Sequence, residues 1–152
     1  MPLKMKLTAI TLDCPDPGAL AAFYQQATGF ELHPGSGGDF AGLTGQDGLF
    51  IGFQRADCHQ APSWPSQNVP QQFHLDFAVD DLDEAEALLL KLGAAKPDFQ
   101  PGGHQWRVLT DPAGHPFCLT RNPPAGKPGS SPKHRQQVNP LPLAVEPPSC
   151  LG

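Results

Sequence analysis

The sequence predicts an α+β domain that contains two copies of one module, each with the element order βαβββ. Two observations lead to this prediction. Near the start of the chain, an alternating apolar segment is followed by a helical apolar stripe and then by a glycine. The same order recurs later in the chain, where Asp81 stands sixty-five residues after Asp16. Short extended segments separated by glycine turns follow both predicted helices. The 152 residues fit one domain of this kind.

The first copy begins with a strand. Apolar and polar side chains alternate between Leu7 and Cys14, as in a strand with one buried face. Asp16 and Pro17 then begin a helix, because aspartate caps free amide groups and proline fits the first turn. Gly29 ends this helix as a left-handed cap. Three further strands are expected over 31–33, 40–44 and 49–54.

The second copy repeats this order. Residues 73–79 form the strand, and Asp81 caps the next helix with Glu84 three residues on, as in a capping box. Gly93 ends that helix. The remaining strands are expected at about 96–99, 106–110 and 116–121, which places the modules at about 7–55 and 72–121.

Residues 122–152 differ in composition from the rest of the chain. They contain eight prolines and no aromatic residue. Such a segment cannot bury enough apolar surface to offset the entropy of ordering its backbone, roughly 1–2 kcal/mol per residue. We therefore expect a folded domain over residues 1–121 and a disordered tail after it.

The charge and the cysteines limit the function classes. Residues 1–121 hold seven Lys or Arg against fourteen Asp or Glu, a balance of −7 that repels the phosphates of nucleic acids. No export signal and no stretch of membrane-spanning length is present. The four cysteines show no paired spacing. We expect a cytoplasmic protein that binds neither nucleic acid nor a membrane.

Eight short motifs follow one another along the predicted domain. They are LDCPDP at 12–17, FY at 23–24, QR at 54–55, WP at 64–65, QQFHLD at 71–76, VDDL at 79–82, WRVL at 106–109 and DPAGHPFCL at 111–119. In this order and spacing they resemble the vicinal-oxygen-chelate (VOC) superfamily, and most closely its glyoxalase-like and bleomycin-resistance-like members. The resemblance implies a cupped, half-barrel mixed sheet with the helices outside. It also implies, for the enzymes of the superfamily, a divalent metal in the cup that grips two neighbouring substrate oxygens.

Two of the four positions at which the resemblance implies metal ligands carry no ligand atom. Ala9 stands at one of them, and the other lies near Gly52. His74 and Cys118 stand at the matching positions of the second module. One imidazole and one thiol fall short of the three or four protein ligands of a tight zinc site. A divalent metal is therefore possible but disfavoured, and it would be held weakly unless Asp76 joined the pair.

The second module holds the residues that we predict to be catalytic, His74 and Asp76. The two-residue spacing places both on one face of a strand. The alternative for His74 is a cup-lining histidine that bonds Asp76 or a ligand. For Cys118 the alternatives are a small buried hydrophobe and a nucleophile paired with His74.

Ligand contacts are expected from a further group of side chains. These are Gln54, Trp64, Trp106 and Cys118. For both tryptophans the alternative is packing in the core. Four further histidines sit in turns, and we interpret them as loop residues: His33, His59, His104 and His115.

Three functions follow as hypotheses. The first is a binding protein that holds a small molecule in a cup with a degraded metal site. The second is a divergent VOC lyase, isomerase or dioxygenase that uses His74 and Asp76, with or without a weakly held divalent metal. The third is a regulatory or scaffold domain whose tail engages a partner. An exposed strand edge also favours a homodimer.

Overall fold

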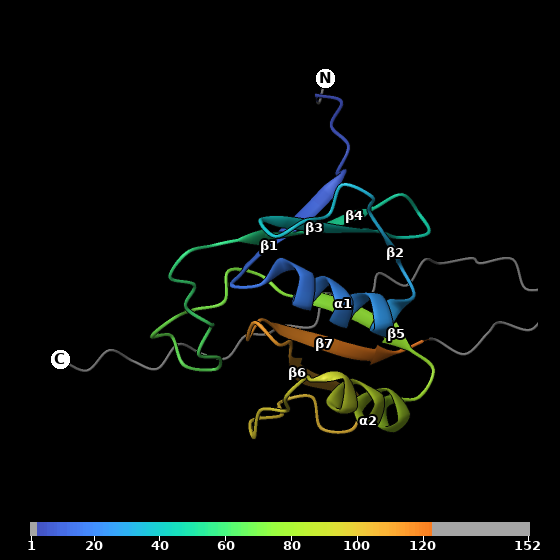
Figure 1. Cartoon of the computed structure of the whole chain (residues 1–152). Helices are drawn as coiled ribbons and strands as arrows, with labels where there is room; N and C mark the ends of the chain where they lie inside the picture. Colours follow the sequence, from blue (N-terminus) through green and yellow to red (C-terminus); the bar gives the residue numbers. More distant parts are fainter. Residues whose placement is uncertain (1–2, 123–152) are drawn as a thin grey trace, which may run out of the picture. The chain divides into compact units, whose positions relative to one another are not determined.

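The computed structural model describes residues 3–122 and confirms the α+β class, with two open sheets and two helices (Figure 1). The predicted tail lies outside the described residues, apart from Asn122. The elements of the first module are β1 (Ala9–Cys14), α1 (Pro17–Thr28), β2 (Glu31–Leu32), β3 (Phe40–Thr44) and β4 (Phe50–Arg55). Those of the second are β5 (Leu75–Val79), α2 (Leu82–Leu92), β6 (Trp106–Thr110) and β7 (Pro116–Arg121).

The three strands of the second sheet repeat the topology of three of the four strands of the first. The first sheet has the strand order β1-β4-β3-β2, and the second has the order β5-β7-β6. In each, the first strand of the module runs parallel to the last, and the remaining pairs are antiparallel. The duplication read from the sequence is therefore present in the strand pairing. The bounds of the strands that form differ from the predicted ones by at most two residues.

Both helices begin and end at the predicted residues. The Asp16 side chain accepts a hydrogen bond from the Ala19 amide at 3.1 Å, and Asp81 caps α2 in the same way. Gly29 and Gly93 follow the helices with φ of 73° and 115°, in the left-handed region that glycine adopts at little cost. Neither helix of the described residues is long and apolar enough to cross a membrane.

The prediction of a strand over 96–99 is wrong. Only Ala95 pairs with β6, through a single bridge to Thr110. Beyond it, the Gln100 side chain donates to the Val108 carbonyl at 2.8 Å and accepts from the Val108 amide at 2.9 Å. One glutamine side chain thus makes the backbone hydrogen bonds of Val108 at the edge of β6. Pro97 has no amide hydrogen, so it could not have donated to a strand ladder there.

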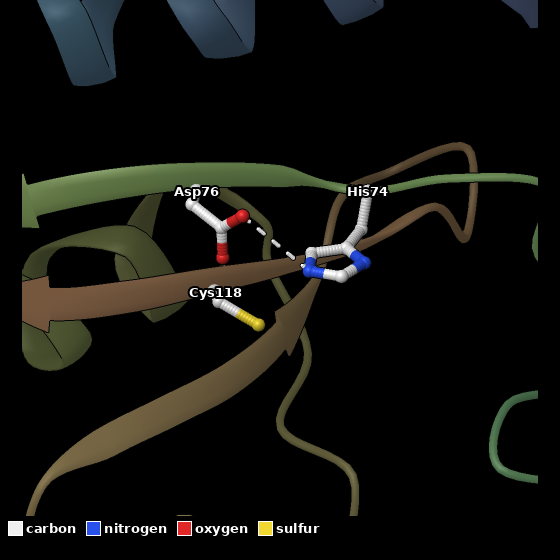
Figure 2. Close-up of side chains that lie close together, drawn as sticks. All are labelled: His74, Asp76 and Cys118. Atoms are coloured by element: carbon white, nitrogen blue, oxygen red, sulfur yellow. Dashed lines mark ion pairs between the residues drawn. The ribbon is translucent and has the colours of Figure 1, made fainter. Parts of the chain in front are cut away.

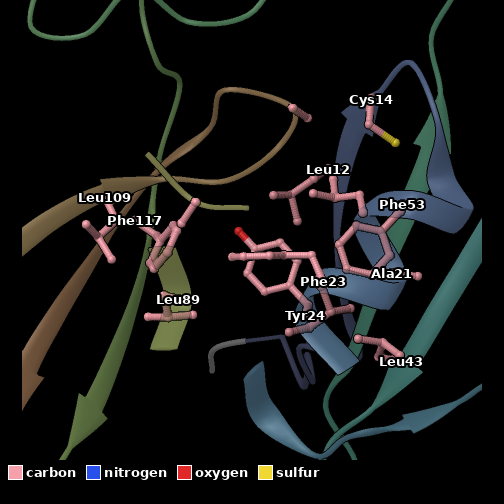
Figure 3. Close-up of a cluster of buried hydrophobic side chains, with 14 of the residues drawn as sticks. Leu12, Cys14, Ala21, Phe23, Tyr24, Leu43, Phe53, Leu89, Leu109 and Phe117 are labelled. Carbon is pink, nitrogen blue, oxygen red and sulfur yellow. The ribbon is translucent and has the colours of Figure 1, made fainter. Parts of the chain in front are cut away.

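Helix α1 packs against both sheets and so joins the modules (Figure 3). The Tyr24 ring stacks on Phe53 of the first sheet at 5.6 Å between ring centroids. It also lies 6.1 Å from Phe77 and 6.2 Å from Phe117, both in the second sheet. Because side chains alternate along a strand, the opposite face of each sheet points away from the helices. The predicted site residues of the second module lie on that opposite face.

Candidate functional site

His74, Asp76 and Cys118 come together on the face of the second sheet that points away from the helices (Figure 2). Asp76 pairs in register with Cys118 across β5 and β7, and His74 precedes Asp76 by two residues on the same face. His74 Nε2 lies 3.4 Å from an Asp76 carboxylate oxygen. One ligand atom from each of the three residues lies within 4.8 Å of the others. The sequence analysis named these three residues as a possible weak metal-binding set, and the structure brings them together.

The three side chains differ in burial and therefore in chemistry. Cys118 is buried, whereas the Asp76 side chain is 55% exposed and that of His74 is 22% exposed. Burial, and after it the negative charge of Asp76, raises the pKa of the Cys118 thiol to about 12. A nucleophilic cysteine needs a lowered pKa. This environment therefore keeps Cys118 a neutral thiol, which could donate a hydrogen bond.

Two of the four positions at which the family resemblance implies metal ligands have no donor atom in their side chains. Ala9 lies on β1 and pairs in register with Phe50, and its methyl group cannot bind a metal. Gly52 and Phe53, on β4, carry no donor atom either, and Phe53 is fully buried. Of these four positions, only those of His74 and Cys118 in the second module offer a ligand atom.

A cavity of about 390 Å³ opens beside His74. The end of β1, the linker between the modules and the turn before β7 surround it. Its polar walls include Asp13, Asp57, His59, Gln71, His74 and His115. This set includes two carboxylates and three imidazoles, and no Lys or Arg lines the cavity. Concave sites with a few convergent polar groups are the usual places where proteins bind small molecules.

The interpretation of His59 and His115 as simple loop residues is incomplete, because both are walls of this cavity. His59 Nε2 lies 3.0 Å from the Ala113 carbonyl oxygen, and His115 Nε2 lies 2.6 Å from that of Asp13. The two rings are 5.5 Å apart between centroids. The linker that holds His59, at residues 57–71, is long for a plain connection, and this length is the sequence feature that points to a functional loop.

The other residues predicted to bind a ligand lie outside this cavity. Gln54 borders a shallow depression with Asp39, Arg55 and Asp57. Trp64 packs against Phe99 with 5.6 Å between ring centroids. Their contact with a ligand stays a prediction.

Trp106 is buried on the second sheet. The residue is 6% exposed. Its ring packs so closely against Gly102 that a Cβ atom added to this glycine would lie 2.3 Å from the ring. The turn that contains Gly102 thus covers the indole, and the packing alternative describes Trp106 better than ligand stacking does.

Comparison with known proteins agrees with the fold. A family model described as a glyoxalase-like domain matches residues 9–120. A glyoxalase/bleomycin resistance protein/dioxygenase family enzyme from Burkholderia phytofirmans is 25% identical, with a TM-score of 0.59 over 77% of this chain and 98% of that one. A possible glyoxalase from Bacillus cereus is 17% identical, with a TM-score of 0.58 over 77% and 99% of the two chains.

A third similar structure is the fosfomycin resistance protein FosX of Listeria monocytogenes, in a complex with Mn(II) and dihydroxypropylphosphonic acid. It is 23% identical, with a TM-score of 0.59 over 78% of this chain and 90% of that one. No curated protein matches the sequence.

Proposed function

Because the chain belongs to the glyoxalase-like domain family, we propose that it binds a small organic molecule in the cavity beside His74. One observation carries the proposal: a cavity of about 390 Å³ whose polar groups converge from both modules and from the linker. Asp13 comes from the first module, and His74 and His115 come from the second. A volume of this size holds a compact ligand of one ring or a short chain.

The residues at the family's metal positions support binding without a metal. Two of these positions offer no donor, and the thiol at a third has a pKa of about 12. A metal would have to displace that proton before the sulfur could bind. Hydrogen bonds from the polar walls would then hold and orient the ligand.

Mass spectrometry under native conditions tests this proposal on protein purified without a chelator. We expect the wild-type chain to carry or take up an organic ligand of defined mass, and we expect the His74→Ala variant to lose it. The His104→Ala variant is the matched control, because His104 is exposed and lies outside the cavity. Equal ligand retention by wild type and His74→Ala would count against the site.

The second candidate is a divergent lyase, isomerase or dioxygenase that uses His74 and Asp76. The observation that favours it is the approach of three potential ligand atoms to within 4.8 Å of one another. Imidazole, carboxylate and thiolate together suit a borderline ion such as Zn²⁺. Metal analysis of the same samples separates the candidates: near-stoichiometric zinc, iron, nickel or manganese that disappears in His74→Ala would favour the enzyme.

A homodimer is part of the proposal. Strands β1 and β5 are sheet edges, and the segment before β1 leaves Leu3, Met5 and Leu7 81%, 83% and 69% exposed. Exposed edges and apolar side chains favour association. We expect light scattering after gel filtration to give twice the monomer mass, and the Leu7→Glu variant to shift towards monomer. A monomeric wild type at micromolar concentration would contradict the proposed dimer.

A further inference from the structure

We infer that the cavity beside His74 selects ligands with a positively charged hydrogen-bond donor, such as a primary ammonium or guanidinium group. This inference rests on the proposed function, since it specifies the ligand class of the same cavity. Three independent features of the cavity support it: the tautomers of its histidines, an unpartnered acceptor, and the sign of its charged groups.

The hydrogen bonds of His59 and His115 determine which ring nitrogens are free. A backbone carbonyl only accepts, so each Nε2 that contacts one must carry the hydrogen. In a neutral imidazole the remaining nitrogen, Nδ1, is then a lone-pair acceptor. In their neutral form, these two rings therefore offer an acceptor nitrogen rather than a donor.

Gln71 adds an acceptor that lacks a partner. Its Oε1 atom is buried, and it is the one buried side-chain nitrogen or oxygen of the described residues without a hydrogen bond. Buried polar atoms are almost always hydrogen-bonded, and an unpaired one is costly. Gln71 lines the cavity. A rotation of the Gln71 side chain would turn this oxygen towards the cavity, where a donor group on a bound ligand would satisfy it.

The charged groups around the cavity are negative. Asp13 and Asp57 line it, and no Lys or Arg does. Arg55 lies 3.5 Å from Asp57, but none of the ion pairs among residues 3–122 involves Asp13. The balance of −7 over residues 1–121 acts in the same direction. A cation is attracted to such a site, and an anion is repelled.

Anionic ligands could be bound in one protonation state of the cavity. If the histidines were protonated, each Nδ1 would become a donor and could hold a carboxylate. A comparison of probes with the same ring and different charge therefore decides between the two classes. Benzylammonium, benzyl alcohol and benzoate differ in charge while keeping nearly the same size.

The experiment titrates each probe into the full-length protein at pH 7.5 and follows amide shifts by NMR. We expect benzylammonium to bind at least about tenfold more tightly than benzoate, the ratio for one charge-assisted hydrogen bond. Tighter or equal binding of benzoate would overturn the inference and leave the proposed function standing. Failure of all three probes to bind would overturn both.

Variants of Gln71 test its role directly. Gln71→Leu should weaken benzylammonium binding several-fold, and Gln71→Glu should strengthen it because a carboxylate is a stronger acceptor for a cation. Gln26→Leu, an exposed substitution on α1, is the matched control and should leave binding unchanged. Equal affinity for all four proteins would exclude Gln71 from the site and overturn its part in the inference.

Discussion

Replacing Asp111 with alanine is expected to destabilise the domain by about 3 kcal/mol or more, since three donors, two of them buried, lose their acceptor. One carboxylate oxygen of Asp111 accepts from the amides of Ala113 and His115, at 2.9 and 3.0 Å. The other accepts from the Tyr24 hydroxyl at 2.7 Å. The side chain thus fixes the turn before β7 and ties it to α1. Urea unfolding of wild type and variant measures the difference.

Asp111→Asn is the matched control, because it keeps the shape and one carbonyl oxygen. Burial raises the pKa of Asp111 above its usual value, more than its hydrogen bonds lower it. A carboxyl whose pKa is higher in the folded state loses stabilisation as pH rises from its unfolded value of about 3.9 through the folded one. Asparagine does not ionise.

The stability of Asp111→Asn relative to wild type should therefore improve as pH rises from about 4 towards neutrality. The opposite trend would show that the carboxylate is stabilised in place, and would contradict this account of the turn.

Alkylation of Cys118 by iodoacetamide at pH 8 is expected to be at least about 100-fold slower than that of Cys58. The pKa of the Cys118 thiol is raised to about 12, and the side chain is buried. At pH 8 such a thiol is ionised in about one molecule in ten thousand. Cys58 is exposed. Peptide mass spectrometry over a time course gives both rates in one sample.

The control for this comparison is the same reaction in denaturing urea, where the two rates should become similar. If Cys118 reacted as fast as Cys58 in the folded protein, it would be an activated thiolate. The hypothesis of a His74–Cys118 nucleophile pair would then replace that of a neutral thiol. The comparison of the two alkylation rates therefore also tests the hypothesis that Cys118 is a catalytic nucleophile.

Features set by neighbouring residues were predictable from the sequence. Asp16 and Asp81 cap helices because their side chains reach amides two or three residues on, and Gly29 and Gly93 end them because of backbone freedom. The His74–Asp76 contact follows from a spacing of two along a strand. The duplicated module follows from the recurrence of these local signals.

Features that depend on distant contacts were not predictable. His59 and His115 meet the cavity through carbonyls 54 and 102 residues away in the chain. No periodicity encodes such pairs. The failed strand over 96–99 has a similar cause, because the Gln100 side chain takes over the hydrogen bonds of Val108 that a strand would have made.

The most direct test of the proposed site is a crystal structure of the protein soaked with benzylammonium. We predict density for the probe beside His74, with its nitrogen within hydrogen-bonding distance of Gln71 Oε1. The chain offers clear alternatives: the Phe40 and Phe50 rings on the first sheet, and the apolar cleft between α1 and α2. Probe density at either of these places, with none beside His74, would contradict the account.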